Sequence, residues 1–168
     1  MSGKDEAPVE VMWRGKYIRA IKQGRWEYVS RTNDVRAVVV IAEFEGKLIL
    51  VDQYRVPIGA RCLELPAGLV GDEDANATVE ETAIKELEEE TGFTAERIER
   101  LGEFHSSPGM VSEGFTLVRA HGVRPSGGKI EDEIDVHLVA RADIPAFVEE
   151  KRIEGFAVDV KLLLFFDF

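Results

Sequence analysis

The chain has 168 residues, of which 45% are apolar and 32% charged, and its formal net charge is -11. This composition is typical of one globular domain with its own core, and the acidic balance excludes nucleic acid and anionic membranes as main partners, because both bind clustered Lys and Arg. The single cysteine, Cys62, excludes an intrachain disulfide, and no apolar run is long enough to cross a membrane or to form a signal core, so we expect a cytoplasmic protein.

The first part of the chain reads mostly as β-strands. Runs rich in β-branched and aromatic residues predict strands at residues 11–21, 25–31, 37–44, 47–56 and 61–70. We expect the first two to pair antiparallel around a turn at residues 22–24, and Glu45-Gly46 predicts a β-hairpin between the next two. The last run, RCLELPAGLV, leads into a Pro/Gly loop.

One helix is signalled at both of its ends. Thr78 and Glu81 have capping-box spacing after the polar loop GDEDANA, and Gly92 is a C-terminal stop. Further strands are predicted at residues 97–107, 114–123 and 134–140, and helical segments at residues 144–152 and 156–165. This order predicts an α+β fold, in which helices pack on a mixed sheet, rather than a repeating βαβ pattern.

Within this helix, the stretch KELEEETGF places four carboxylates in five consecutive positions. At about 100° per residue, Glu86 and Glu90 point within about 40° of each other, and Glu89 lies beside Glu86. These three carboxylates lie along the apolar stripe, whereas Glu88 points toward solvent. The carboxylates therefore divide into two groups.

Two interpretations of the three-carboxylate face remain open. We expect Lys85 to pair with Glu81 on the solvent side, in the favourable i, i+4 sense, so that no cation balances the three. The face is then either a solvated acidic surface or a site for a hard divalent cation such as Mg²⁺, which prefers carboxylate oxygens.

The same residues resemble the signature of the Nudix hydrolase family, which is Gly, five residues, Glu, seven residues, then Arg-Glu-aliphatic-x-Glu-Glu-x-Gly-aliphatic. Residues 85–93 fit its second half, with Lys85 in place of Arg and Phe93 in place of the last aliphatic residue. DQYRVP, GARCLELPAGLV and SSPGMVSE are similar to the ADP-ribose and ADP-sugar pyrophosphatase branch of the family.

The first half of the signature departs from the family pattern. By strict spacing its Glu falls on Ala77 and its Gly on Gly71. By context the glycine is instead Gly68 of the Pro-Ala-Gly loop, which implies a three-residue insertion in GDEDANA.

The resemblance implies a Nudix-type α/β/α sandwich with a mixed β-sheet and an N-terminal antiparallel strand pair. Residues 1–33 would serve dimerisation and nucleotide contact, and residues 34–168 would form the hydrolase domain of a homodimer. The implied reaction is metal-dependent hydrolysis of the pyrophosphate bond of a nucleoside diphosphate sugar, foremost ADP-ribose to AMP and ribose 5-phosphate. Ala77 and Lys85 motivate an alternative, a Nudix-fold module that binds or senses a nucleotide sugar with weak catalysis.

The resemblance also implies a set of metal ligands and a base. Mg²⁺, or Mn²⁺, would neutralise the phosphate charge and lower the pKa of a bound water. Its ligands would be the Ala67 carbonyl, Glu86, Glu89, Glu90 and Asp132. The catalytic groups would be Glu131 or Glu133 of the acidic loop KIEDEID as general base, together with Glu89.

On the substrate side, the resemblance implies contacts to phosphate, sugar and adenine from residues on several segments. They are Trp26, Arg31, Arg36, Arg55, Leu69, Ser107, Pro108, Gly109 and Glu113. The three histidines are scattered singly, without a zinc-like spacing, and we assign them no chemistry.

Overall fold

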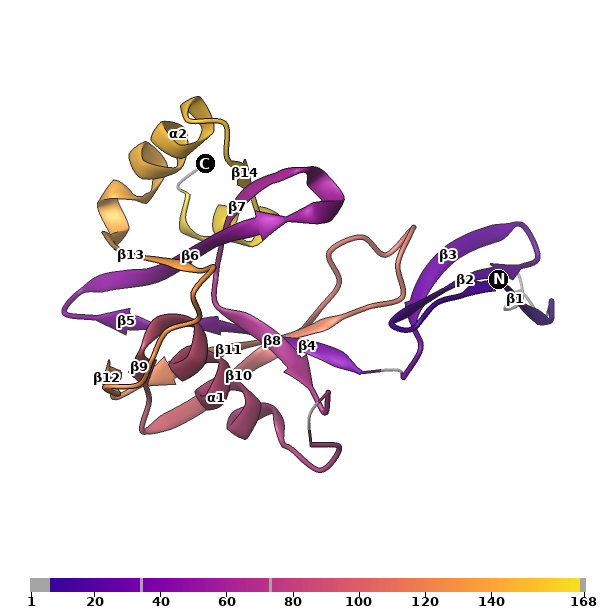
Figure 1. The fold of residues 1–168 in the computed structure, drawn as a ribbon, viewed down its shortest axis with the longest axis horizontal. Helices are drawn as coiled ribbons and strands as arrows, with labels where there is room; N and C mark the ends of the chain where they lie inside the picture. Colours follow the sequence, from indigo (N-terminus) through magenta and orange to yellow (C-terminus); the bar gives the residue numbers. More distant parts are fainter. Residues whose placement is uncertain (1–6, 34, 73, 167–168) are drawn as a thin grey trace.

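The computed structural model describes residues 7–33, 35–72 and 74–166. An N-terminal antiparallel sheet consists of β1 (Val9–Arg14), β2 (Ile18–Gln23) and β3 (Trp26–Arg31), and it lies to one side of the rest of the molecule (Figure 1). The strand predicted at residues 11–21 is therefore two strands. The chain turns between them, where the Gly15 N–H donates to the Ile18 carbonyl at 2.9 Å. Residues 1–6 of the expected N-terminal unit lie outside the described residues.

Two further sheets form the body of the molecule. The first has the order β10-β11-β4-β8, with strands Arg97–Phe104, Phe115–His121, Arg36–Ile41 and Ala67–Val70. The second has the order β13-β6-β7-β14, with strands Asp135–Ala140, Lys47–Arg55, Ala60–Glu64 and Ala157–Val158, and β5 (Glu43–Phe44) pairs with β6. The short β9 (Phe93–Thr94) and β12 (Arg124–Pro125) pair with each other. Both main sheets mix parallel and antiparallel pairs.

The chain passes from one sheet to the other at two places where a single strand was predicted. The predicted hairpin is limited to β5 and β6, with Glu45 (φ 50°) and Gly46 (φ 76°) in its turn, because β4 ends at Ile41 and pairs with β8 and β11 instead. RCLELPAGLV likewise divides into β7 and β8 at Leu65-Pro66. This second crossing brings residues 65–68 between the two sheets.

Helices cover the sheets on two sides, as Figure 1 shows. β4 is buried on both faces: Val38 and Val40 pack with Ala83 and Leu87 of α1 (Val79–Thr91). Val39 and Ile41 belong to a second cluster, which includes Ile144 and Val148 of α2 (Ile144–Ile153) and Leu162 of the 3₁₀-helix η3 (Val160–Phe165). The expected α/β/α sandwich is thus confirmed, although the helix predicted at residues 156–165 is β14 followed by η3. Two further 3₁₀ turns are η1 (Val56–Ile58) and η2 (Arg141–Asp143).

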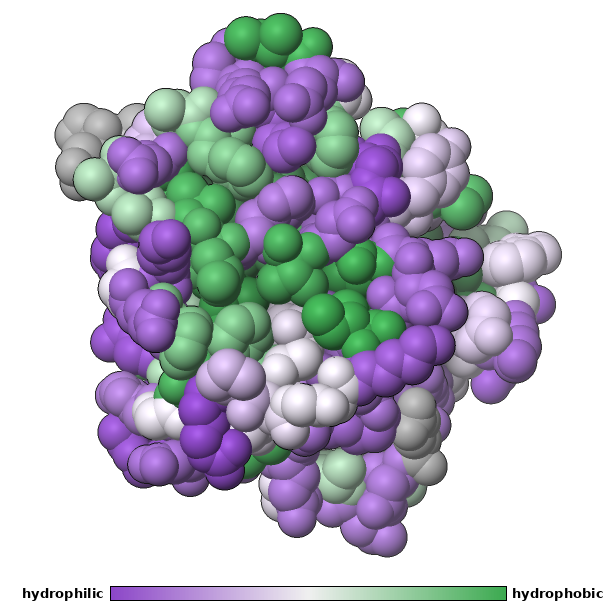
Figure 2. Space-filling model, turned by 60° about the vertical axis from the view of Figure 1, so that its left-hand side comes forward, coloured by the Kyte–Doolittle hydropathy of each residue, from purple (hydrophilic) through white to green (hydrophobic). Residues whose placement is uncertain are grey.

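The surface has both apolar and hydrophilic regions. Figure 2 shows a face on which apolar side chains gather near the centre and hydrophilic ones surround them. Within the described part of the chain, no helix is long and apolar enough to cross a membrane.

Candidate functional site

The helix α1 is fixed at both ends by the predicted signals. The Thr78 Oγ1 accepts a hydrogen bond from the Glu81 N–H at 3.2 Å, and the Glu81 carboxylate accepts one from the Thr78 N–H at 2.9 Å. At the other end, Gly92 (φ 71°) donates its N–H to the Glu88 carbonyl. Because Ala83 and Leu87 are fully buried, the rotation of the helix about its axis is set by the core.

This rotation turns Glu90 inward. Glu90 as a whole residue is 6% exposed, and its Oε2 accepts a hydrogen bond from the Ala67 N–H at 3.0 Å. Burial raises the pKa of Glu90 to about 8, and the negative charges of Glu86 and Glu131 add to this shift. The hydrogen bond from the Ala67 N–H and the positive charge of Arg55 oppose it. An ionised Glu90 therefore lacks sufficient positive charge around it, which a bound cation would supply.

The loop between the two sheets faces these carboxylates. The Val40 N–H donates to the Pro66 carbonyl at 2.8 Å, so Val39 and Ala67 form a non-hydrogen-bonded antiparallel pair. The N–H and carbonyl of Ala67 consequently point away from β4, and the N–H reaches Glu90. The Ala67 carbonyl, which was predicted to be a metal ligand, therefore points to the same side as its N–H.

Gly68 lies against Glu86. A Cβ at Gly68 would come within 1.9 Å of the Glu86 Cδ, so the Glu86 side chain would have to move. At Gly71 a Cβ would meet nothing closer than 3.9 Å, and its φ of 87° marks an ordinary turn glycine. The close approach at Gly68 supports reading it, rather than Gly71, as the glycine of the signature.

The acidic loop docks on the C-terminal end of α1. Ser126 donates to the Gly92 carbonyl from its N–H at 2.8 Å and from its hydroxyl at 3.0 Å, and the Glu131 N–H donates to the Glu89 carbonyl at 3.1 Å. This docking brings Glu131 into electrostatic range of Glu90. Glu131, Asp132 and Glu133 are all exposed, and Asp132 lies 3.3 Å from the Lys129 ammonium.

Glu89 has a different environment from the one expected. The Lys85 ammonium donates to its carboxylate at 2.8 Å, and the Glu89 side chain is 43% exposed. The expectation that no cation balances the three-carboxylate face was therefore wrong. Glu81 is held by the capping box with Thr78, and Lys85 binds the glutamate one turn toward the C-terminus.

A hollow of about 400 Å³ opens beside Ala67 and Gly68. Each cation that lines it is paired with a carboxylate. Arg55 binds Glu64 through two hydrogen bonds of 2.7 Å, Arg31 pairs with Glu113, and Lys161 pairs with Asp159. The remaining lining residues are Ala37, Val39, Leu69, Ser106, Gly114 and Phe115.

Four of the predicted substrate residues line this hollow, namely Arg31, Arg55, Leu69 and Glu113. Arg36 is turned elsewhere and pairs with the exposed Glu103. Trp26 is 48% exposed on β3, with the Arg25 guanidinium 5.5 Å from its ring centre.

Residues 107–109 form a turn next to the hollow, in which the Val111 N–H donates to the Ser107 carbonyl at 2.9 Å. The next residues join this turn to the N-terminal sheet. The Val29 N–H donates to the Met110 carbonyl, and the Ser112 N–H donates to the Val29 carbonyl, both at 2.9 Å. Arg31 follows this bridge by two residues in β3, and Glu113 follows it by two residues in the other segment. The two side chains pair with each other.

Sequence reasoning missed Glu64, Asp159 and Lys161. Glu64 had a signal, since an acid inside the apolar run CLELPA needs a buried partner. Asp159 and Lys161 had none, because they belong to a segment that was read as a regular helix.

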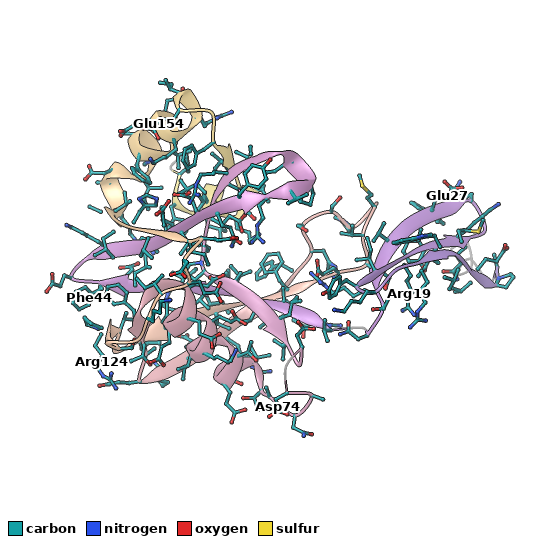
Figure 3. The ribbon with its side chains drawn as sticks, viewed as in Figure 1. Arg19, Glu27, Phe44, Asp74, Arg124 and Glu154 are labelled. Atoms are coloured by element: carbon teal, nitrogen blue, oxygen red, sulfur yellow. The ribbon has the colours of Figure 1, made fainter. Side chains whose placement is uncertain are left out.

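The loop before α1, marked by Asp74 in Figure 3, projects away from the body of the molecule.

The donor chemistry of the site suits Mg²⁺ or Mn²⁺. Glu86, Glu90 and the Ala67 carbonyl offer oxygen atoms only, which is the ligand type of hard cations. Among the residues that the structure describes, His, Cys, Asp and Glu side chains form no group of three that could hold a metal ion by themselves. A bound ion would therefore rely on the backbone carbonyl and on substrate oxygens as well.

Comparisons with known proteins agree with this arrangement. Residues 32–154 match the family model described as the NUDIX domain. A Caenorhabditis elegans protein named as a nudix hydrolase is 33% identical over 93% of this chain and 81% of its own length. An ADP-ribose pyrophosphatase of Bacillus subtilis is 42% identical over 46% of the chain, which spans only 40% of that enzyme. The crystal structure of an ADP compounds hydrolase shares the fold, with a TM-score of 0.70 and 23% identity over 94% of this chain and 89% of that one.

Proposed function

The chain belongs to the Nudix hydrolase family, and from this premise we propose that it hydrolyses the pyrophosphate bond of a nucleoside diphosphate sugar in a metal-dependent reaction. ADP-ribose, split into AMP and ribose 5-phosphate, is the leading substrate, because ADP-ribose and ADP-sugar pyrophosphatases are among the relatives. The observation that carries the proposal is the buried Glu90 carboxylate, which faces Glu86 and is bound to the loop at Ala67. Ionising a carboxylate this deeply buried is costly, and a bound cation would offset that cost.

Glu86, Glu90 and the Ala67 carbonyl would hold Mg²⁺, with Mn²⁺ as a substitute. When bound, the ion supplies charge neutralisation at the diphosphate and an activated water. Glu131 is the proposed general base that takes the proton of the attacking water, since the acidic loop places it near Glu90 without making it part of the helix. Glu89 is paired with Lys85. We therefore propose that it neutralises the Lys85 charge rather than acting as a catalytic group.

The hollow would hold the rest of the substrate. The positive charge of Arg55 interacts with Glu90. Two hydrogen bonds to Glu64 hold the Arg55 guanidinium in a fixed geometry. Arg31 and Glu113, which pair with each other, also line the hollow. Phosphate oxygens can bind the arginines, and hydroxyl groups of a sugar can donate to the paired carboxylates.

We also propose a homodimer that forms through the N-terminal sheet. This sheet leaves large apolar side chains in solvent, among them Val9, Val11, Met12, Trp13, Tyr17 and Trp26. Such a concentration on a small sheet is typical of an interaction surface. Light scattering at micromolar concentration would give the mass of a dimer, and a monomer would contradict this part of the proposal. We expect the dimer to work in the cytoplasm.

The deciding experiment for the proposed activity is hydrolysis of a nucleotide-sugar panel with and without Mg²⁺. The panel contains ADP-ribose, ADP-glucose and GDP-mannose, and Glu90→Gln is the control variant. We expect metal-dependent release of AMP from ADP-ribose, and a loss of at least about a hundredfold in Glu90→Gln. If wild-type protein turns over no member of the panel with either Mg²⁺ or Mn²⁺, the enzyme proposal is wrong.

A further inference from the structure

The segment after α2 builds part of the hollow, although it lies beyond the family match, which ends at residue 154. β14 pairs in parallel with β7, with Ala157 opposite Cys62 and Val158 opposite Leu63. The Asp159 N–H then donates to the Leu63 carbonyl at 3.0 Å. The segment is therefore fixed to the strand that leads directly into the Ala67 loop.

Lys161 is held at the wall of this hollow. Its side chain is 16% exposed, its ammonium pairs with the Asp159 carboxylate, and it lies 5.4 Å from the centre of the Phe115 ring. The other oxygen of Asp159 accepts a hydrogen bond from the Lys161 N–H at 2.8 Å. Both residues line the hollow together with Phe115, Arg31 and Arg55.

A lysine in this position has binding capacity left for a ligand. An ammonium group carries three donor hydrogens, and an aromatic ring attracts its charge without accepting a conventional hydrogen bond. Ion pairing with Asp159 and contact with Phe115 keep the long side chain ordered before a ligand arrives, which lowers the entropy cost of binding. Lysine is a common partner for phosphate oxygens as a point charge.

We propose that Lys161 is a substrate-binding residue whose ammonium contacts an anionic oxygen of the nucleoside diphosphate sugar. This inference rests on the proposed function, because it takes the hollow to be the substrate site. The family signature supplies the proposed metal face, and the segment beyond residue 154 supplies a contact that lies outside the family match. Affinity for the substrate should therefore depend on Lys161, and metal binding should not.

Lys151 provides a matched control. Its side chain is also 16% exposed, it pairs with Glu154 at 2.8 Å, and it lies 4.8 Å from the centre of the Phe156 ring. Lys151 is on α2 and is not among the residues that line the hollow. A purely structural lysine at position 161 would thus behave like Lys151 when its charge is removed.

The test compares wild-type protein with Lys161→Met, Lys161→Arg and Lys151→Met. Binding of ADP-ribose is measured by titration calorimetry in EDTA, and kcat and KM are measured with Mg²⁺. We expect Lys161→Met to weaken binding and to raise KM by about tenfold, with kcat changed by less than about threefold. Lys161→Arg should recover most of the affinity, and Lys151→Met should bind as wild type does. Thermal unfolding of each variant verifies that it is folded.

Equal affinity of wild type, Lys161→Met and Lys151→Met for ADP-ribose would overturn the inference, as would a failure of wild type to bind ADP-ribose at all. Wild type that binds ADP-ribose but does not hydrolyse it would count against the proposed function only. The Lys161 comparison would still be decided by calorimetry in that case.

Discussion

The Ala67 N–H donates a hydrogen bond to the Glu90 carboxylate at 3.0 Å, across 23 residues of sequence. This bond joins the last turn of α1 to the point where the chain crosses between the two main sheets. It also orients the carboxylate, because one oxygen is held by the backbone while Glu86 lies nearby. The helix and the loop therefore act as one rigid unit at the proposed metal site.

Stability of the metal-free protein should fall as pH rises. The pKa of Glu90 is raised from 4.5 to about 8, chiefly by burial, so the folded state holds a proton that the unfolded state releases between these values. The stabilisation is complete below about pH 4.5 and is lost as pH approaches 8, by about 5 kcal/mol over the whole range and about 3 kcal/mol between pH 6 and pH 9. Urea unfolding in EDTA at pH 6 and pH 9 measures the difference. Glu90→Gln, whose amide cannot ionise, should show a smaller decrease, and an identical decrease in both proteins would refute the assignment.

Gly68→Ala should destabilise the protein through a clash with Glu86. The added Cβ would meet the Glu86 Cδ at 1.9 Å, and because only this flexible side chain has to move, the cost should be about 0.5–1.5 kcal/mol. The double variant Gly68→Ala/Glu86→Ala removes the clash and should recover part of this loss beyond the sum of the single changes. Urea unfolding of all four proteins gives the coupling. Strict additivity would mean that Gly68 is required for another reason.

Arg55→Lys should reduce kcat/KM for ADP-ribose by about tenfold or more. A lysine cannot keep both hydrogen bonds to Glu64, so its charge would no longer be held at the hollow. Arg100 is the matched control, because it makes the same two-point contact with Glu80, at 2.6 and 2.8 Å, on the exposed surface. Steady-state kinetics of Arg100→Lys should match wild type. Equal losses in the two variants would indicate a general effect of losing an arginine pair.

Among the carboxylates of the acidic loop, Glu131 should carry the catalytic effect. Its N–H donates to the Glu89 carbonyl, and its charge acts on the Glu90 carboxylate, although its side chain is exposed, like that of Glu133. Glu131→Gln should lower kcat by roughly 10²- to 10⁴-fold, the usual range for loss of a general base. Glu133→Gln should change kcat by less than about fivefold on the same argument. A larger loss in Glu133→Gln than in Glu131→Gln would transfer the role to Glu133.

The features that could be predicted from the sequence are those with local causes. Thr78, Glu81 and Gly92 act within a few residues of the chain, and the helix begins and ends where they indicated. The period of the glutamates likewise placed Glu86 and Glu90 on the inner side. Lys85 was assigned to the wrong partner. Angular positions on a helix do not show that the Glu81 carboxylate is already bound to the Thr78 N–H in the capping box, so Lys85 pairs with Glu89 instead.

The remaining features depend on contacts between distant segments. The division of RCLELPAGLV into two strands follows from the partners β6 and β4, which belong to different sheets. Lys161 reaches the hollow only because β14 pairs with β7, and a strand of two residues leaves no periodic pattern. The pairing of Arg31 with Glu113 joins residues that are 82 positions apart.

The bridge between Val29 and residues 110–112 couples the N-terminal sheet to the hollow. Because Arg31 and Glu113 flank that bridge, a rotation of the N-terminal sheet would carry both of them together and leave Glu86 and Glu90 in place. Under the proposed function, mutations in the N-terminal sheet should alter which substrates are accepted and leave the proposed metal site on α1 undisturbed. In the proposed enzyme, the residues that select the substrate could therefore change while the proposed metal ligands Glu86 and Glu90 stay the same.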